Sequence, residues 1–217
     1  MRTLTKSVFG SPGSRAGRSA LALVTLASAL ALVALLALSA TPAQSAERNA
    51  NTTQVSGGKT LLKLDPDTAG ALSDAGVRVE ATGKATGPTG NGVFRFPIVG
   101  GKVDKDPLGG QIVHSGGLAF SAGLERVVVQ RFVIDLDRGV LTAKVAGTGQ
   151  RIALLRLGTP EGAKVGAEKI VLRGVDAKLT AQAAAALNKR FDTELFEAGL
   201  LIGEVTVIAQ IGDDRRR

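Results

Sequence analysis

Hydrophobic and polar residues alternate in many short runs from residue 58 onward, and glycines separate these runs. In Val93–Ile98, Phe94, Phe96 and Ile98 share one face of an extended chain, while Arg95 points to the other. The same period of two occurs in eight further runs, namely Leu61–Leu64, Val77–Ala81, Gln111–Phe120, Val127–Leu136, Leu141–Val145, Ile152–Leu157, Ile170–Val175 and Ile202–Ile211. This spacing predicts a mainly β fold, either an antiparallel β-sandwich or a flattened barrel.

One hairpin is predicted where Asp137-Arg138-Gly139 follows the run that ends at Leu136. Phe132 before this turn and Leu141 after it fall on the apolar face of the hairpin, whereas Arg131 falls on the opposite face. The pattern therefore predicts that Phe132 and Leu141 are core residues and that Arg131 is exposed.

Two short helices interrupt the strands. The first is predicted after Asp65, which suits an N-cap, with Pro66 at the first helical position and Gly76 as the stop. The second is predicted from Thr180, also an N-cap, to about Phe191, with an Ala- and Leu-rich apolar stripe.

The N-terminal segment has the pattern of an export signal. Four basic residues and no acidic one precede Ala20, and the run Ala20–Ala40 contains no charge. The small and polar residues of Thr41–Ala46 follow, as in a signal-peptide cleavage region. A run of this length is also long enough to span a bilayer, so a retained membrane anchor is the alternative.

These patterns predict four segments. Residues 1–46 form a signal peptide, residues 47–57 a flexible lead-in, residues 58–211 the β domain and residues 212–217 a charged tail. The part after the signal is large enough to bury the core of one domain.

Composition excludes several classes of function. The net charge is +8, but residues 1–46 hold four of the 27 basic residues and none of the 19 acidic ones, which leaves 23 against 19, or +4. With this small surplus and no Trp or Tyr, the chain lacks the basic, aromatic surface of a nucleic-acid binder. The absence of Cys excludes disulfides and thiolate chemistry, so the core alone must stabilise an exported fold.

His114 is the single histidine and the one candidate ligand-binding residue. It lies in the run Gln111–Phe120, on the same face as Ile112 and on the opposite face from Ser115. A hydrogen-bonded packing residue is one interpretation, and a contact to a cofactor or ligand is the other. No Gly-x-Ser-x-Gly motif accompanies it, so we expect no catalytic residues and no enzymatic activity.

Two carboxylate pairs, Asp104 with Asp106 and Asp135 with Asp137, lie on one side of extended segments. Neither continues into the ligand pattern of a calcium loop, so we interpret them as solvated turn carboxylates and predict no metal site. Gly116-Gly117 is interpreted as a β-bulge, with a close backbone contact to a ligand as the alternative.

Several segments together resemble the HtaA-type domain. They are Gly100–Asp104, Gly110–Ile112, Ser115–Phe120, Phe132–Leu136, Gly139–Ala143 and Leu179–Ala181 before an Ala-rich helix. HtaA-type domains occur in exported haem-uptake proteins of Gram-positive bacteria, and this distant resemblance covers roughly residues 58–211. It implies a β-sandwich with two short helices and a possible haem ligand.

The resemblance does not carry the family's iron ligands onto this chain. The family holds haem through a Tyr, supported by a His that lies a few residues after a phenylalanine of the sheet, and this chain contains no Tyr. If Phe120 matches that phenylalanine, the family's His falls near Gly123 or Leu124, whereas His114 precedes Phe120. Haem iron could be held by His114, or haem could bind through apolar contact alone, and either would be a different site from that of the family. We expect weak haem binding at most, and we expect any such binding to depend on His114.

Taken together, the sequence favours an exported, non-catalytic domain, secreted or at the cell surface, that binds a small molecule as an accessory module related to haem uptake. The alternative is a structural or protein-interaction domain of the cell envelope without such a ligand. Neither nucleic acid nor, after signal cleavage, a membrane is an expected partner.

We predict that the mature protein begins between Gln44 and Glu47, because the small-residue region ends there and the chain then becomes polar. N-terminal sequencing of secreted protein tests this prediction. Recovery of the chain with Met1 intact in the membrane fraction would support the anchor instead.

Overall fold

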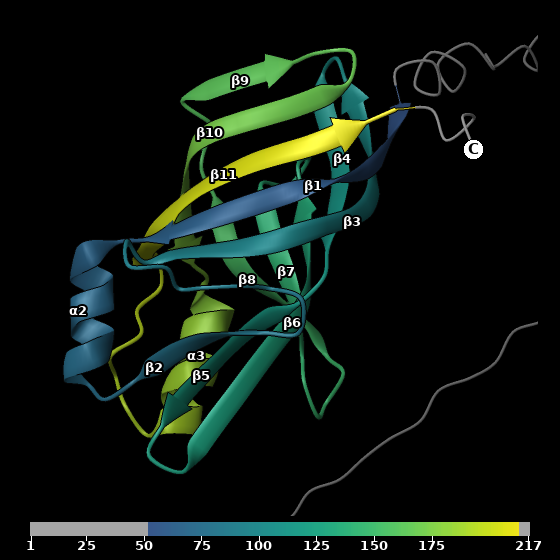
Figure 1. Cartoon of the computed structure of the whole chain (residues 1–217). Helices are drawn as coiled ribbons and strands as arrows, with labels where there is room; N and C mark the ends of the chain where they lie inside the picture. Colours follow the sequence, from purple (N-terminus) through teal and green to yellow (C-terminus); the bar gives the residue numbers. More distant parts are fainter. Residues whose placement is uncertain (1–51, 213–217) are drawn as a thin grey trace, which may run out of the picture. The chain divides into compact units, whose positions relative to one another are not determined.

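The computed structural model describes residues 52–212, which contain eleven strands and two helices (Figure 1). The strands are β1 (Thr52–Leu64), β2 (Arg78–Thr82), β3 (Val93–Lys105), β4 (Leu108–His114), β5 (Gly117–Ala122), β6 (Glu125–Asp135), β7 (Val140–Val145), β8 (Arg151–Leu157), β9 (Gly162–Val165), β10 (Lys169–Leu179) and β11 (Leu201–Ile211). The helices are α2 (Pro66–Asp74) and α3 (Ala181–Phe191). The mainly β fold with two short helices is confirmed, while the expected signal peptide lies outside the described residues.

Eight strands form a closed antiparallel barrel. Their order is β6-β4-β3-β1-β11-β10-β8-β7, and β7 closes the barrel by pairing with β6. The long strand β6 pairs with β4 through its second half and with β5 through its first half. β2 and β5 extend the sheet beyond the barrel, and β9 pairs with β10. Of the two predicted architectures, the chain therefore adopts the barrel.

The flexible lead-in expected over residues 47–57 is wrong for its second half, because β1 begins at Thr52. Thr53 pairs with Val103 of β3, and Val55, which is 2% exposed, pairs with Ile211 of β11. Gly57, the last residue of the expected lead-in, and Gly58, the first residue of the expected β domain, lie beside a bulge inside the strand. Gly58 has φ +119°, and a Cβ there would lie 2.1 Å from the Ile208 carbonyl oxygen. Glycine thus permits the close strand contact at this bulge.

The run Gln111–Phe120 is also divided, into β4 and β5, instead of forming one strand with a bulge. The division falls at Gly116, which has φ +82° and would place a Cβ 2.4 Å from the backbone nitrogen of Ala85. The Gly116 carbonyl accepts a hydrogen bond from the Arg131 amide, 3.0 Å away. A turn supported by that close backbone contact therefore interrupts the alternation.

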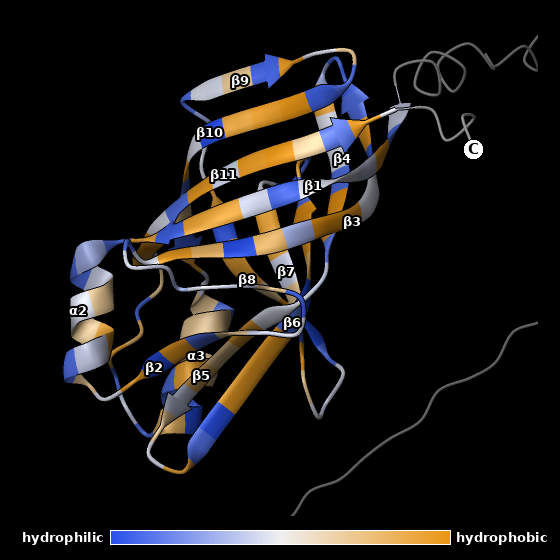
Figure 2. Cartoon of the chain, viewed as in Figure 1, coloured by the Kyte–Doolittle hydropathy of each residue, from blue (hydrophilic) through white to orange (hydrophobic). Residues whose placement is uncertain are grey.

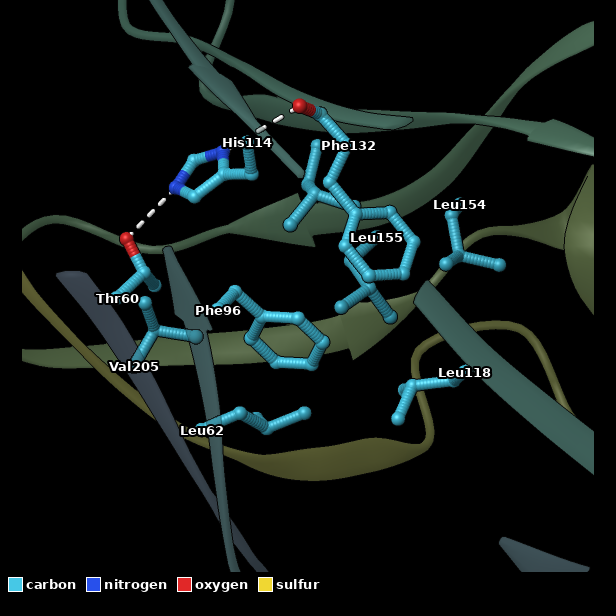
Figure 3. A pocket seen from close by; sticks show the side chains of 10 residues that line it. Thr60, Leu62, Phe96, His114, Leu118, Phe132, Leu154, Leu155 and Val205 are labelled. Carbon is cyan, nitrogen blue, oxygen red and sulfur yellow. Dashed lines mark hydrogen bonds between the residues drawn. The ribbon is translucent and has the colours of Figure 1, made fainter. Parts of the chain in front are cut away.

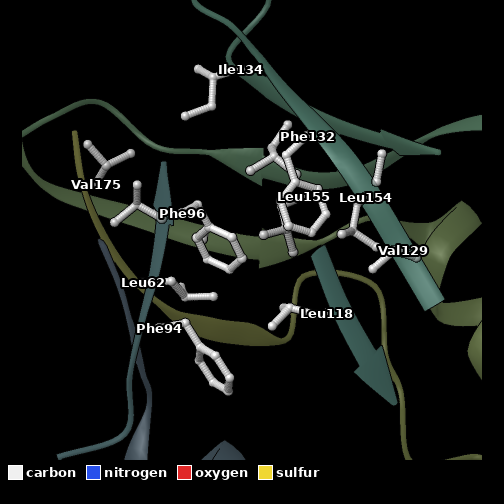
Figure 4. Close-up of a cluster of buried hydrophobic side chains, with 14 of the residues drawn as sticks. Leu62, Phe94, Phe96, Leu118, Val129, Phe132, Ile134, Leu154, Leu155 and Val175 are labelled. Atoms are coloured by element: carbon white, nitrogen blue, oxygen red, sulfur yellow. The ribbon is translucent and has the colours of Figure 1, made fainter. Parts of the chain in front are cut away.

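Hydrophobic and polar residues follow one another along the strands (Figure 2), and inward hydrophobic side chains fill the barrel (Figure 4). Phe94, Ile112 and Ile134 are 0% exposed. Phe96 and Phe132 meet edge to face, with ring centroids 5.2 Å apart. Phe132 and Leu141 are both buried, which confirms the predicted hairpin face.

Both helices begin at the predicted caps. The Asp65 carboxylate accepts a hydrogen bond from the Thr68 amide at 3.0 Å, and the Thr180 hydroxyl accepts one from the Ala183 amide at 3.1 Å. α3 buries Ala183, Ala184 and Leu187 and packs against β8. Within residues 52–212, neither helix has the length and apolar character needed to cross a membrane.

We predict that Phe132→Ala lowers the free energy of unfolding by about 3–5 kcal/mol, because it leaves a cavity beside Phe96. Arg131→Ala is the control: Arg131 is exposed and has φ 55°, a strain that Ala would share, so its cost should stay within about 0.5 kcal/mol. Urea unfolding of both variants measures these costs. Similar small losses in the two variants would contradict the packing described here.

Candidate functional site

His114, the candidate ligand-binding residue, lies inside the barrel at the end of β4 and is 2% exposed (Figure 3). Its Nε2 lies 2.7 Å from the Thr60 hydroxyl of β1, and its Nδ1 lies 3.3 Å from the Phe132 carbonyl oxygen of β6. The structure thus brings together one residue from each of three strands. Both ring nitrogens already have partners in the protein.

These partners determine the tautomer of the imidazole. A carbonyl oxygen can only accept a hydrogen bond, so the proton lies on Nδ1 and is donated to Phe132. Nε2 then accepts the hydrogen bond from the Thr60 hydroxyl. This arrangement is typical of the hydrogen-bonded packing histidine, one of the two interpretations of the sequence.

The space beside His114 is small and apolar. It has a volume of about 30 Å³ and is lined by Thr60, Leu62, Phe96, Leu118 and Phe132, among others. A space of this size holds a water molecule or two, whereas drug-sized ligands occupy pockets of roughly 300–1,000 Å³. A macrocycle therefore has no room at His114 in this conformation.

The Thr60–His114 pair resembles a hydroxyl–imidazole dyad but lacks the rest of a hydrolytic site. The second ring nitrogen faces a carbonyl instead of a carboxylate that could stabilise an imidazolium ion. Burial lowers the pKa of His114 from 6.5 to about 4, although its backbone hydrogen bonds partly oppose this shift. At neutral pH the ring is therefore uncharged.

One of the carboxylates that the sequence analysis assigned to solvated turns is buried. Asp135 is 9% exposed and accepts hydrogen bonds from the Arg138 amide at 3.0 Å and from the Gln111 side chain at 3.3 Å. The hairpin turn and the neighbouring strand cover it, which the local alternation did not indicate. Asp137 is exposed and accepts a hydrogen bond from the Gly110 amide at 3.0 Å. Within residues 52–212, no three His, Cys, Asp or Glu side chains are grouped to hold a metal ion.

A larger hollow lies at the surface between α2 and β2, and we call it the α2–β2 concavity. Its volume is about 530 Å³, and it is lined by Leu64, Ala69, Leu72, Ser73, Gly76, Val77, Arg78, Val79 and Glu80. This volume falls within the range of small-molecule sites. The concavity combines apolar walls with polar groups, as such sites usually do.

Two opposite charges lie at the edge of the α2–β2 concavity. Glu80 forms an exposed ion pair with Arg126 at 3.4 Å. Arg78 is exposed and, among the described residues, forms no ion pair. Arg78 is therefore the cation at this site that remains available to an anionic group.

An apolar layer separates the α2–β2 concavity from His114. Leu64, Leu72 and Val79 line the concavity and also a smaller apolar space of about 30 Å³ on its inner side. Leu62 and Leu118 lie between that space and the one beside His114 (Figure 3). A molecule in the concavity would thus not reach the imidazole.

Comparison with solved structures identifies the fold. The C-terminal domain of HtaA from Corynebacterium glutamicum aligns with a TM-score of 0.55 and 16% sequence identity, over 74% of this chain and 99% of that domain. The fold resembles an HtaA domain. The N-terminal domain of HtaA from the same organism aligns with a TM-score of 0.52 and 14% identity, over 73% of this chain and 99% of that domain. The sequence matches no family model and no curated protein.

The comparison confirms the resemblance found in the sequence at the level of the fold. Sequence reasoning missed Thr60, which lies 54 residues before its partner His114. A hydroxyl at an inward position of β1 was the available signal. Sequence reasoning also missed the α2–β2 concavity, because a surface hollow depends on how α2 packs against its neighbours and no sequence motif marks it.

We predict that the burial of His114 makes the fold less stable in mild acid. The unfolded chain takes up a proton near pH 6.5, whereas the folded protein does so only near pH 4. Stability is therefore full above pH 6.5 and falls as the pH decreases toward 4. Between pH 7 and 5 the free energy of unfolding should fall by about 2 kcal/mol.

Urea unfolding at several pH values measures this loss, and His114→Gln is the matched control. The variant should lose much less stability over the same range, because glutamine does not titrate. An equal loss in both proteins would contradict a depressed pKa of His114.

Proposed function

We propose that this chain is an exported, non-catalytic ligand-binding module, secreted or at the cell surface, that serves haem uptake in an accessory role. The α2–β2 concavity is the proposed site. The observation that carries the proposal is the combination of an HtaA-like fold with a partly apolar hollow of ligand size and an arginine, Arg78, that forms no ion pair among the described residues.

Haem is the ligand class that the family resemblance implies, but the side chains do not fit a coordinated iron. The chain has no Tyr or Cys, and its one Met is Met1. His114 engages both ring nitrogens and lies behind an apolar layer. Haem coordination therefore has no suitable side chain at the proposed site.

A porphyrin could still bind through its other properties. Leu64, Leu72 and Val79 offer apolar contact to a flat ring, and Arg78 offers hydrogen bonds to a carboxylate. Such a site would bind the porphyrin ring and its carboxylate groups without coordinating the metal. Delivery of haem to another protein suits binding of this kind, because no iron bond must break on release.

The scattered positions of the large exposed apolar side chains favour this proposal over the structural alternative. Among the described residues, the large exposed hydrophobic side chains are Val99, Leu124 and Val165, which come from separate parts of the chain. A docking surface for a protein partner would be expected to gather such residues into one patch.

We expect the domain to bind iron-free protoporphyrin and haem with similar affinity, measured by titration of Soret absorbance. His114→Gln should leave both affinities unchanged. Arg78→Ala should weaken both by about two- to fivefold, the range of an exposed ion pair.

A charge placed at the site gives a matched pair of variants. Ser73 lines the α2–β2 concavity, whereas Ala71 of the same helix is exposed and does not. Ser73→Glu should weaken porphyrin binding, and Ala71→Glu should not. Haem binding that requires iron and is lost in His114→Gln would contradict the proposal, and no binding of either porphyrin would favour the structural alternative.

A further inference from the structure

Arg126 does not line the α2–β2 concavity, but it contacts a residue that does. Its Nη1 donates to Glu80 Oε2 at 3.4 Å and to the Ser121 hydroxyl at 3.1 Å. Glu80 lines the concavity, whereas Ser121 does not. Arg126 can therefore affect a ligand in the concavity through the Glu80 carboxylate.

The strand register places these charged side chains on one face of the sheet formed by β2, β5 and β6 (Figure 1). Ser121 of β5 pairs with Arg78 of β2 on one side and with Arg126 of β6 on the other, so the three side chains form a row. Glu80 is two residues from Arg78 on the same strand and shares that face. Ala119 pairs with Glu80, and its small side chain is 0% exposed. The ion pair between Arg126 and Glu80 can therefore cross β5 above it.

Glu80 has two cations within reach. Arg78 is two positions away, about 7 Å along the strand, and both side chains are long enough to close that gap. Among the described residues, however, Glu80 pairs with Arg126, and Arg78 pairs with no carboxylate. The Ser121 hydroxyl holds the Arg126 guanidinium at a second point, which favours this choice of partner.

We propose that Arg126 is a positioning residue for the α2–β2 concavity: it holds the Glu80 carboxylate away from Arg78 and so keeps the Arg78 guanidinium available to an anionic ligand. Without Arg126, Glu80 would pair with Arg78, and the site would lose its free cation. The choice of a porphyrin as the ligand rests on the proposed function, whereas the arrangement of the three charges does not.

Titration with protoporphyrin at low salt, where exposed charges are least screened, measures the effect on binding. Arg126→Ala should weaken binding about two- to fivefold, as much as Arg78→Ala, because Glu80 then occupies Arg78. Glu80→Gln should not weaken binding. The double variant Glu80→Gln/Arg126→Ala should bind as tightly as Glu80→Gln alone, since no carboxylate remains for Arg126 to hold.

Arg190→Ala is the matched control. Arg190 forms an ion pair of similar exposure with Glu125 at 2.8 Å, and neither residue lines the concavity. This variant removes the same charge and should leave porphyrin binding unchanged. The dimethyl ester of protoporphyrin is the control ligand, because it offers Arg78 no carboxylate. Its affinity should be the same with and without Arg126→Ala.

A second measurement needs no porphyrin. The Nε–Hε resonance of the Arg78 side chain, assigned by its loss in Arg78→Ala, reports by NMR whether the guanidinium has a carboxylate partner. In the ligand-free protein, Glu80→Gln should change this resonance little. Arg126→Ala should shift it, and adding Glu80→Gln to that variant should return it to its original position.

Two results would overturn the proposal. The first is an Arg78 resonance that does not respond to Arg126→Ala. The second is a loss of protoporphyrin affinity in Arg126→Ala that is equally large with and without Glu80→Gln, because Arg126 would then attract the ligand directly. If the unsubstituted protein binds no porphyrin, the proposed function fails, and the Arg78 resonance alone decides the role of Arg126.

Discussion

Closure of the sheet by β6 and β7 is the constraint on which the rest of the structure depends. Through the pairing of Ile134 with Leu141, eight strands become a barrel in which inward side chains have fixed neighbours. Packing then determines what remains empty. Phe96 and Phe132 take up most of the space beside His114, so the imidazole faces protein groups and room for a water molecule or two.

The same closure determines where ligands can bind. Volume of ligand size is available where an element lies outside the barrel wall, at the α2–β2 concavity.

The sequence was sufficient for elements in which local signals agree with the fold. Alternation located most strands, Asp65 and Thr180 marked the helix starts, and the hairpin at Asp137–Gly139 followed from its turn residues. Other features depend on contacts between distant segments. Gly58 follows a polar segment that resembles a linker, but it lies inside β1. The carbonyl of Ile208 approaches it closely, so a glycine is needed there. Local patterns contain no information about that approach.

At the candidate site, too, local sequence patterns could not predict the contacts between distant segments. Alternation placed His114 on the inward face correctly, yet it could not reveal that Thr60 and the Phe132 carbonyl occupy both ring nitrogens. Likewise, Asp135 lies in a turn sequence typical of solvated carboxylates, and only the register between β4 and β6 places Gln111 over it. Chemistry-bearing residues could be named from the sequence, whereas their accessibility required the fold.

His114 joins β1, β4 and β6 through its two ring hydrogen bonds, and we expect this structural role to exclude ligation of a metal. Because the chain has one histidine, NMR of its imidazole nitrogens is unambiguous, and zinc protoporphyrin is a diamagnetic probe with an open axial position. We expect a neutral ring protonated at Nδ1, with nitrogen shifts that stay unchanged when the probe binds. A large change in the Nε2 shift on adding zinc protoporphyrin, with loss of the Thr60 hydrogen bond, would contradict this expectation.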